Sequence, residues 1–281
     1  MEENNKNIER FVRMNGAGNK FLVFESFQKS LNVNQELVKK LYNTQIDDPF
    51  DQFVLLEKAK RQGDAHVSFW NADGSTSGMC GNALRCVAHL VFARKKRDLI
   101  ILETINKDIN CWKSNNLISV DVGIPSFEWN DIPLNNEVED TLSMKLPSAP
   151  CDLPNFSAVN IGNPHAVFFF REVTPELKKY GHEIENNPIF PERVNVSFAN
   201  ILNRNLVKLD VWERGSGITL ACGSAACATV AVGSKLNLMD KEVEVSLPGG
   251  ILKIVLDENG HIILTGPYEI EKEIKINLSD I

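Results

Sequence analysis

Two segments, one in each half of the chain, follow the same plan. In the first, a strand-like run ends at Trp70 and a turn leads to Cys80; in the second, a similar run ends at Trp212 and a turn leads to Cys222. The spacing from Trp to Cys is ten positions in both (80 − 70 and 222 − 212). A glycine and then a small, apolar, helix-like stretch follow each cysteine. The pattern predicts two copies of one structural unit.

A second pair of matching segments lies upstream at nearly the same separation. Asn19 and Asn163 each follow a glycine and precede an apolar run. The two asparagines are 144 residues apart (163 − 19) and the two cysteines 142 (222 − 80), about half of the 281 residues. Chance similarity is the alternative, since short patterns match by accident. Two-unit architectures usually bury ligand sites between the units, so we expect the cysteines to face each other across one cavity.

Strand-like and helix-like patterns alternate along the chain. Residues 21–25 and 53–56 are predicted strands, and the spacing of apolar residues over 31–42 predicts a helix. Residues 83–92 and 225–232 are apolar around most of the helix circumference. That distribution is typical of a central helix wrapped by strands and not of a surface helix.

The end of the chain carries a hairpin pattern and a final strand-like run. Residues 250–256 and 261–264 flank a turn of the type Asp-Glu-Asn-Gly, which predicts a β-hairpin. The run 269–278 alternates isoleucine with charged residues, and we expect it to return to the first unit as an edge strand. Residues 124–150 are rich in Pro, Asn, Asp and Glu with weak periodicity, which indicates a crossover.

These patterns together predict an α/β (α+β) fold made of two pseudo-symmetric, strand-rich units. The N-terminal unit would comprise residues 1–130, with 268–281 returning to it, and the C-terminal unit residues 131–267. The expected active site lies in the cleft between them.

Composition narrows the range of functions. The net charge of −7 and the pI of about 5.4 argue against nucleic acid or anionic lipid as a partner, because phosphate binding needs a basic surface. The polar start at 1–10 does not resemble a signal peptide. No apolar run approaches the roughly 20 residues of a membrane-spanning helix. We therefore expect no membrane partner and a cytoplasmic location.

The six cysteines are too sparse for a disulfide scaffold, so reduced thiols are expected. Cys80 and Cys86 are six positions apart, and Cys222 and Cys227 five (86 − 80 and 227 − 222). Neither interval matches the tight loops of structural zinc sites, and no metal is predicted. Cys86 and Cys227 are expected to be buried as small hydrophobic residues.

The position of each Cys-Gly pair suits acid–base chemistry at a carbon atom. A thiol ionises more readily at a helix N-terminus, where unpaired backbone N–H groups favour negative charge. Gly81-Asn82 and Gly223-Ser224 would form an anion pocket that holds a substrate carboxylate. The same N–H groups would stabilise the negative charge that develops when a proton leaves the α-carbon. Opposed thiols suit a reaction that removes a proton from one face and returns it to the other.

Glu213-Arg214 has two interpretations. An adjacent Glu-Arg pair is usually a solvated surface pair, but a planar guanidinium also suits bidentate binding of a carboxylate. Its place in the repeat, eight positions before Cys222 (222 − 214), favours a role in substrate binding.

His165 likewise has two interpretations. It could be a hydrogen-bonded core histidine, or it could tune the pKa of a cysteine without touching the substrate.

Seven segments resemble the diaminopimelate epimerase family and together span nearly the whole chain. They are MNGAGNKFLVF, DQFVLLE, NADGSTSGMCGNALRC, IGNPHAVFF, PERVNVSFA, WERGSGITLACGSAACA and LTGP. The resemblance implies a cofactor-independent isomerase that converts LL- to meso-diaminopimelate, on the route to lysine and peptidoglycan. It also implies barrel-like sheets wrapped around central helices, and a homodimer.

The resemblance assigns roles to residues by their positions in these segments. Cys80 and Cys222 fall on the two catalytic acid/base thiols, and His165 and Glu213 on positions that adjust their pKa values. The positions that contact substrate are Asn19, Gln52, Asn71, Gly81, Asn82, Asn163, Asn195, Glu213, Arg214, Gly223 and Ser224.

Several positions depart from the commonest pattern of the family, although no thiol or named contact is lost. The departures are Asn15, Lys20, Ala83-Leu84, Ile218 and Ala225. Two other functions stay open. One is a racemase of the same fold, independent of pyridoxal phosphate, that acts on another amino acid; the other is a thiol redox sensor without catalytic activity.

Overall fold

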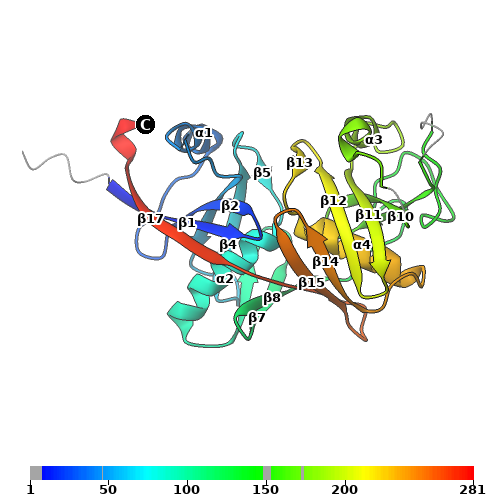
Figure 1. Ribbon diagram of the computed structural model, residues 1–281. Coiled ribbons are helices and arrows are strands. Elements are labelled where there is room, and N and C mark those ends of the chain that lie inside the picture. Colours follow the sequence, from blue (N-terminus) through cyan, green and yellow to red (C-terminus); the bar gives the residue numbers. More distant parts are fainter. Residues whose placement is uncertain (1–7, 46, 148–152, 172–173) are drawn as a thin grey trace, which may run out of the picture. The chain divides into compact units, whose positions relative to one another are not determined.

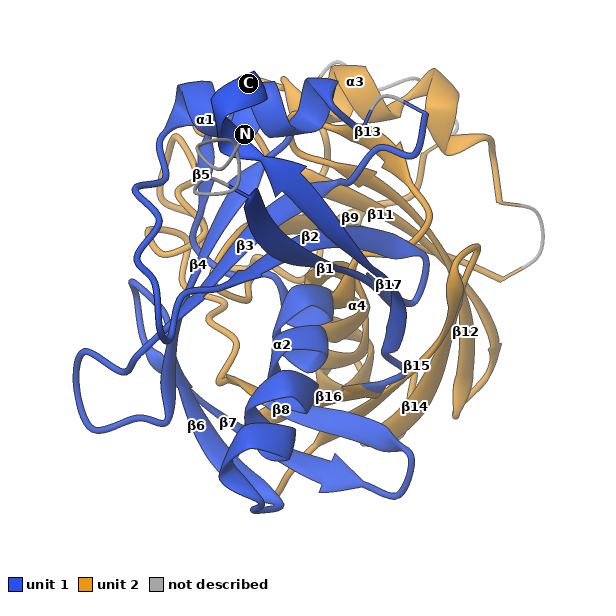
Figure 2. Ribbon diagram, turned by 90° about the vertical axis from the view of Figure 1, so that its left-hand side faces the viewer, with its two compact units in different colours: residues 1–120, 266–281 blue, residues 121–265 orange. Residues whose placement is uncertain are grey.

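The computed structural model describes residues 8–45, 47–147, 153–171 and 174–281 (Figure 1). The chain divides into two compact units, coloured separately in Figure 2. Unit 1 comprises Met1–Val120 and Gly266–Ile281, and unit 2 comprises Asp121–Thr265. Each unit is mixed α+β and rich in strands, as the sequence predicts.

Unit 1 contains a long central helix, a short peripheral helix and more residues in strands than in helices. The elements are β1 (Ile8–Gly16), β2 (Asn19–Glu25), α1 (Gln35–Asn43), β3 (Gln52–Glu57), β4 (Ala65–Asn71), β5 (Thr76–Ser77), α2 (Gly81–Lys95), β6 (Leu99–Glu103), β7 (Asp108–Ser114), β8 (Leu117–Gly123), β17 (Glu269–Asn277) and the 3₁₀ turn η3 (Leu278–Asp280). The last three residues of β8 belong to unit 2. The strand β2 runs parallel to β3, which is antiparallel to β4. In turn β4 pairs antiparallel with β5 and parallel with β6.

Unit 2 repeats this order. Its elements are β9 (Phe156–Asn160), β10 (Pro164–Phe170), η2 (Leu177–Lys179), α3 (Gly181–Glu185), β11 (Asn195–Asn203), β12 (Leu206–Glu213), β13 (Gly217–Thr219), α4 (Gly223–Lys235), β14 (Glu242–Leu247), β15 (Gly250–Leu256) and β16 (Ile262–Gly266). The pairings of β10, β11, β12, β13 and β14 repeat those of β2, β3, β4, β5 and β6, in the same directions. The two sequence repeats are therefore two copies of one fold.

The helices α2 and α4 are buried because they carry apolar or small side chains on every face. The helix α2 contacts β1, β2, β6 and β7, and Figure 2 shows it enclosed by strands of its own unit. The helix α4 contacts β9, β10, β11 and β15. Cys86 and Cys227 are fully buried in these helices, as expected. Burial raises the pKa of the Cys86 thiol to about 12, so this thiol stays protonated.

The predicted helix at 31–42 begins later than expected, at Gln35. Asn34 has an extended backbone, and its Oδ1 accepts a hydrogen bond from the N–H of Leu37 at 2.9 Å. An asparagine in this conformation caps the helix and fixes where it starts. The apolar residues before it, Leu31 and Val33, pack against the core of unit 1 without joining the helix.

The final strand and the hairpin agree with the sequence. The strand β17 pairs antiparallel with β1, from Ile8 opposite Asn277 to Asn15 opposite Glu269. The strands β15 and β16 form the predicted antiparallel hairpin.

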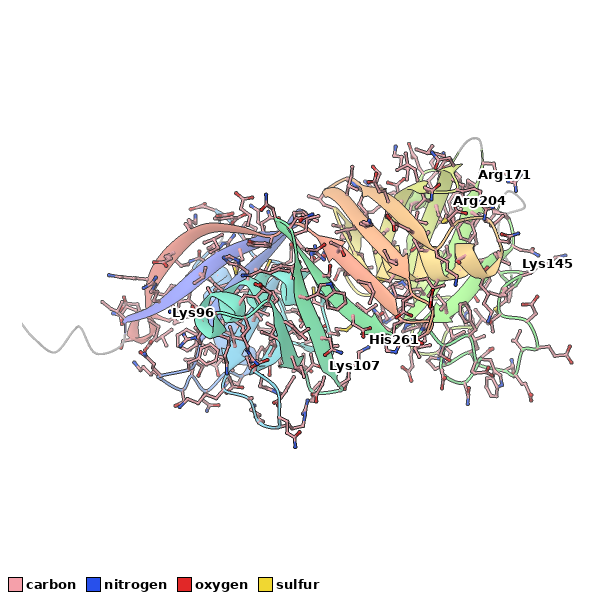
Figure 3. All side chains as sticks on the ribbon, turned by 90° about the horizontal axis from the view of Figure 1, so that it is seen from below. Lys96, Lys107, Lys145, Arg171, Arg204 and His261 are labelled. Carbon is pink, nitrogen blue, oxygen red and sulfur yellow. The ribbon has the colours of Figure 1, made fainter. Side chains whose placement is uncertain are left out.

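Arg204, labelled in Figure 3, extends from the turn between β11 and β12 and donates to Oδ1 of Asp240 at 2.7 Å, just beyond the end of α4.

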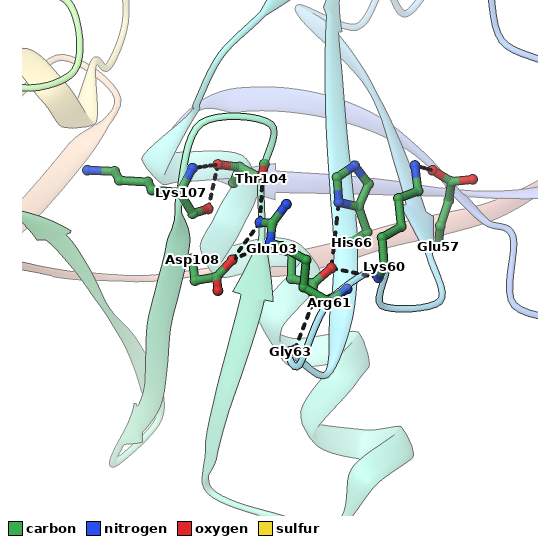
Figure 4. Close-up of polar contacts among 9 residues, drawn as sticks. All are labelled: Glu57, Lys60, Arg61, Gly63, His66, Glu103, Thr104, Lys107 and Asp108. Atoms are coloured by element: carbon green, nitrogen blue, oxygen red, sulfur yellow. Dashed lines mark hydrogen bonds and ion pairs between the residues drawn. The ribbon is translucent and has the colours of Figure 1, made fainter.

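A buried carboxylate organises one loop of unit 1. Glu103 is inaccessible to solvent and accepts hydrogen bonds from the backbone N–H groups of Lys60, Arg61 and Gly63 at 2.7, 2.8 and 2.7 Å (Figure 4). Burial alone would raise the pKa of Glu103, but these backbone donors outweigh it and lower the pKa. The carboxylate therefore stays charged and holds the loop between β3 and β4 closed.

None of the helices in the described part of the chain is both long and apolar enough to cross a membrane.

Candidate active site in two matching halves

Cys80 and Cys222 occupy the same position in the two units. Each residue immediately precedes a central helix, at the N-cap position of α2 or α4. Their backbones match, with φ −141° and ψ 109° at Cys80 and φ −132° and ψ 110° at Cys222. Cys80 is half-buried, Cys222 is 6% exposed, and neither forms a disulfide. Each sulfur-bearing residue thus lies where the first N–H groups of a helix have no helical partner.

The second residue after each cysteine is tied to the asparagine of the upstream Gly-Asn pair. In unit 1, Nδ2 of Asn82 donates to Oδ1 of Asn19 at 3.1 Å. In unit 2, Nδ2 of Asn163 donates to Oγ of Ser224 at 3.4 Å. The two sequence motifs of each half are therefore one structural feature, in which an asparagine at the start of a strand orients the first turn of the helix.

Gln52 and Asn71 form a second polar pair in unit 1. They are directly opposite each other on β3 and β4, and Nε2 of Gln52 donates to Oδ1 of Asn71 at 3.0 Å. The other polar atom of Gln52, Oε1, is buried and has no partner within the described residues. A buried acceptor without a partner is costly, and an amino group of a ligand would satisfy it.

A hydrogen-bonded series leads from His165 to Cys222 in unit 2. Nε2 of His165 lies 2.9 Å from Oδ1 of Asn163, which binds Ser224, and Oγ of Ser224 lies 3.4 Å from the Cys222 sulfur. Because the Asn163 oxygen can only accept, Nε2 of His165 carries the proton. Burial, reinforced by the charge of Arg214, lowers the pKa of His165 to about 3. His165 is thus neutral and fully buried, and hydrogen bonds through Asn163 and Ser224 connect it to Cys222.

Glu213 is the last residue of β12, Arg214 follows it, and both are half-buried. Oε1 of Glu213 accepts from the Thr219 hydroxyl at 2.6 Å. The backbone N–H of Arg214 donates to Oδ1 of Asn195 at 3.0 Å, and its Nη1 donates to the carbonyl of Glu192 at 3.0 Å. The pair is therefore built into the strand end and is not a fully solvated surface pair.

A polar cavity of about 270 Å³ in unit 2 adjoins two of the predicted site residues. Its lining residues are Asn130, Asp131, Pro133, Asn160, Gly162, Asn163, Pro164, Glu192 and Arg214. Within the described residues, no group of three or more His, Cys, Asp or Glu side chains is arranged to hold a metal ion.

Sequence comparison agrees with the duplicated geometry. The family described as diaminopimelate epimerase matches residues 11–127 and 157–271. The chain belongs to the diaminopimelate epimerase family. A diaminopimelate epimerase of Rhodopseudomonas palustris (strain TIE-1) is 41% identical over 271 residues, covering 94% of this chain and 92% of that protein. One of Pelagibacter ubique is 38% identical over 276 residues, covering 95% and 98%.

Solved structures share the fold at low sequence identity. A hydroxyproline epimerase from Agrobacterium vitis, with bound trans-4-hydroxy-L-proline, has a TM-score of 0.68 and 14% identity, covering 98% of this chain and 94% of that one. A predicted epimerase from Pseudomonas aeruginosa has a TM-score of 0.65 and 13% identity, covering 95% and 99%. The chain thus has the architecture of diaminopimelate epimerases and related epimerases and is a member of an isomerase family.

Two of the departures from the usual pattern of diaminopimelate epimerases, Asn15 and Lys20, lie in unit 1 and have hydrogen-bond partners there. Nζ of Lys20 pairs with Oδ1 of Asp48 at 2.8 Å, a hydrogen bond that raises the pKa of Lys20. Hydrogen bonds from Lys20 and Lys272 lower the pKa of Asp48 to about 2. Asn15 accepts from the N–H of Gly18 at 2.7 Å. The positive charge introduced beside Asn19 is therefore neutralised locally.

The departures near the second cysteine differ in exposure. Ala225 is fully buried in α4, and Ile218 is 53% exposed on β13. The additional methyl group at Ala225 fits the core, and Ile218 contacts solvent.

Some residues that support the site are not apparent in the sequence. Oδ2 of Asp51 accepts from Nδ2 of Asn19 at 2.8 Å, and Thr219 binds Glu213. Asp51 is 32 positions from Asn19 (51 − 19), so only the tertiary structure reveals this pairing.

Proposed function

We propose that this protein interconverts LL- and meso-diaminopimelate without a cofactor, with Cys80 and Cys222 as the two acid/base groups. The observation that carries the proposal is the equivalent placement of these cysteines at the starts of two central helices, in a chain of the diaminopimelate epimerase family. One unit supplies a thiolate to one face of the α-carbon, and the other unit supplies a thiol to the opposite face.

The substrate carboxylate at the reacting centre binds to the backbone N–H groups at the helix starts. Gly81 and Gly223 follow the cysteines directly, and both are buried. Helix N-termini favour anions because their N–H groups are unpaired and the helix dipole is positive there. The side chains of Asn82 and Ser224, which Asn19 and Asn163 orient, complete the pocket.

The reaction is a proton transfer in two directions. The thiolate sulfur takes the α-proton, and the electron pair of the broken C–H bond delocalises into the carboxylate as an enolate-like anion. The thiol on the other face gives its proton to the same carbon and becomes the thiolate. The configuration inverts, and no atom is oxidised or reduced. The N–H groups that bind the carboxylate also stabilise the charge of the intermediate.

Residues that do not touch the α-carbon either adjust the pKa of a catalytic thiol or recognise the substrate. Neutral His165 fixes Asn163, which fixes Ser224 beside Cys222. Glu213, which accepts a hydrogen bond from the Thr219 hydroxyl, adjusts the pKa of the Cys222 thiol. Asn71, Asn195 and Arg214 recognise the distal end of the substrate, where the guanidinium of Arg214 binds the second carboxylate.

The proposal includes the cellular setting. The substrate is a small molecule, and the reaction supplies lysine and peptidoglycan precursors in the cytoplasm, where the enzyme is a homodimer. A related racemase is the second candidate, because a structure with bound hydroxyproline shares this fold. Arg214 favours diaminopimelate, since a monocarboxylic amino acid would leave this guanidinium without its distal carboxylate.

Solvent deuterium incorporation tests the proposal. The reduced protein, with no pyridoxal phosphate or metal added, should exchange the α-proton of diaminopimelate with solvent and equilibrate the LL and meso forms. Absence of exchange under reducing conditions would contradict the proposal. Exchange with proline or hydroxyproline in place of diaminopimelate would favour the second candidate.

A further inference from the structure

A buried glutamate outside the predicted site holds the turn that carries Glu213 and Arg214. Glu185 is the last residue of α3 and is only 4% exposed. Its Oε2 accepts from Nε1 of Trp212 at 2.7 Å, and its Oε1 accepts from the backbone N–H of Gly215 at 2.7 Å. The two contacts bracket Glu213 and Arg214 in the sequence.

The turn is fixed from two sides. The N–H of Arg214 donates to Oδ1 of Asn195, and the next N–H, that of Gly215, donates to Glu185. Gly215 has φ of +81°, a conformation that favours glycine and that releases the chain from β12. Because two consecutive backbone amides are bonded to side chains of other elements, the direction in which the Arg214 side chain leaves the backbone is determined.

The same carboxylate reaches the segment before β11. Nη1 of Arg193 donates to Oε1 of Glu185 at 3.2 Å. The neighbouring residue, Glu192, accepts from Nη1 of Arg214 at its backbone carbonyl. Glu185 is therefore hydrogen-bonded on both sides of Arg214. It contacts the turn of Arg214 through Gly215, and it contacts the segment that accepts from the Arg214 guanidinium through Arg193.

The environment of Glu185 calls for a carboxylate. All three neighbours, the Trp212 indole, the Gly215 amide and the Arg193 guanidinium, are hydrogen-bond donors. An ionised carboxylate offers only acceptors, whereas a glutamine would turn an NH₂ group toward one of these donors. A buried donor left without an acceptor is destabilising. The indole is also held by packing, because a Cβ at Gly181 would lie 2.4 Å from Cδ2 of Trp212.

We propose that Glu185 is a positioning residue for substrate recognition, which fixes the Glu213-Arg214 turn so that Arg214 meets the distal carboxylate of the substrate. This proposal rests on the proposed function. Glu185 touches no reacting atom in it, and its effect passes through Gly215, Trp212 and Arg193. At the corresponding turn of unit 1, Nε2 of Gln35 donates to the carbonyl of Asp73 at 3.2 Å.

The test compares Glu185→Gln with Glu183→Gln, which removes the same charge from an exposed position of the same helix. Glu185→Gln should raise the KM for diaminopimelate about tenfold, the cost of one lost charge-assisted hydrogen bond. Its kcat should change by less than about threefold, because neither thiol is affected. Glu183→Gln should behave as the wild type. An unchanged KM in Glu185→Gln, or a loss of kcat with no change in KM, would overturn the proposal.

Two further measurements keep the outcome decisive. If Glu185→Gln does not fold, Trp212→Phe keeps an aromatic ring at this position and removes one donor to Glu185; an unchanged KM in that variant would then reject the role. If the wild type does not turn over diaminopimelate, the proposed function fails on its own. Amide hydrogen exchange at Gly215 then decides: about tenfold faster exchange in Glu185→Gln than in Glu183→Gln supports positioning, and equal exchange refutes it.

Discussion

His165 donates its Nε2 proton to Oδ1 of Asn163 at 2.9 Å, in a fully buried position where its other ring nitrogen has no partner among the described residues. The imidazole is therefore a neutral donor of fixed tautomer. Its pKa of about 3, lowered by burial and then by Arg214, lies far below the usual value of 6.5.

This depressed pKa predicts a specific pH dependence of stability. Between pH 6.5 and pH 3 the unfolded chain binds a proton at His165 that the folded protein does not, so the contribution is complete above pH 6.5 and is lost as the pH falls. Between pH 7 and pH 5, the wild type should lose about 2 kcal/mol more unfolding free energy than His165→Gln. Urea denaturation at both pH values measures the difference; equal losses would mean that folding does not lower the pKa of His165.

The two cysteines should be equally indispensable. Cys80→Ala and Cys222→Ala should each lower kcat by about 10³-fold or more, because each removes one of two acid/base groups. Cys86→Ala and Cys227→Ala are matched controls, since these buried thiols lie one turn or more along the same helices. The controls should lose stability and keep most of their turnover. Near wild-type epimerisation by either of the first two variants would eliminate the two-thiol mechanism.

Arg214 should determine substrate selection. Arg214→Met should raise the KM for diaminopimelate about 10- to 100-fold, because a bidentate guanidinium–carboxylate contact is lost. Steady-state kinetics should show little change for Arg204→Met, an exposed arginine at the far turn between β11 and β12. If Arg214→Met slowed exchange of a monocarboxylic amino acid to the same extent, the distal assignment would be incorrect.

Glu103 should contribute stability without affecting catalysis. Glu103→Gln should lower the unfolding free energy by about 2–3 kcal/mol, because one or more backbone N–H groups of the loop lose a charged acceptor. Since the folded pKa of Glu103 is lowered, its contribution is present above the unfolded pKa and is lost as the pH falls. Glu57→Gln, on the half-exposed pair with Lys60, is the control and should cost less than about 1 kcal/mol. Equal destabilisation of both variants would contradict the role given to Glu103.

The repeat, the central helices and the terminal strand could be predicted because each has a local pattern. Trp70 and Trp212 stand ten positions before their cysteines, and the backbone at both cysteines is nearly identical. Apolar residues on every face of 83–92 and 225–232 indicated burial on all sides. These signals depend only on neighbours in the sequence.

The supporting contacts could not be predicted, since their partners are distant in the chain. Glu185 is 30 positions from Gly215 (215 − 185) and looks like an ordinary helix-surface glutamate in the sequence. Its contacts with Trp212 and Gly215 appear only when α3 packs against the end of β12. Asp51 beside Asn19 is a similar case. The predicted start of α1 is wrong because the helical spacing of apolar residues already begins at Leu31, before Asn34. Asn34 caps the helix, so the residues before it stay outside the helix.

The pairing of β17 with β1 has a consequence for biosynthesis. Unit 2 is one continuous stretch, Asp121–Thr265, whereas unit 1 needs β17, which follows unit 2 in the chain. On the ribosome, domains generally fold as units while synthesis proceeds. Unit 2 can therefore complete its sheet first, and the first-made residues must wait with one edge of β1 uncovered until translation reaches Glu269–Asn277. An exposed strand edge during this interval is a site for mispairing with other nascent chains.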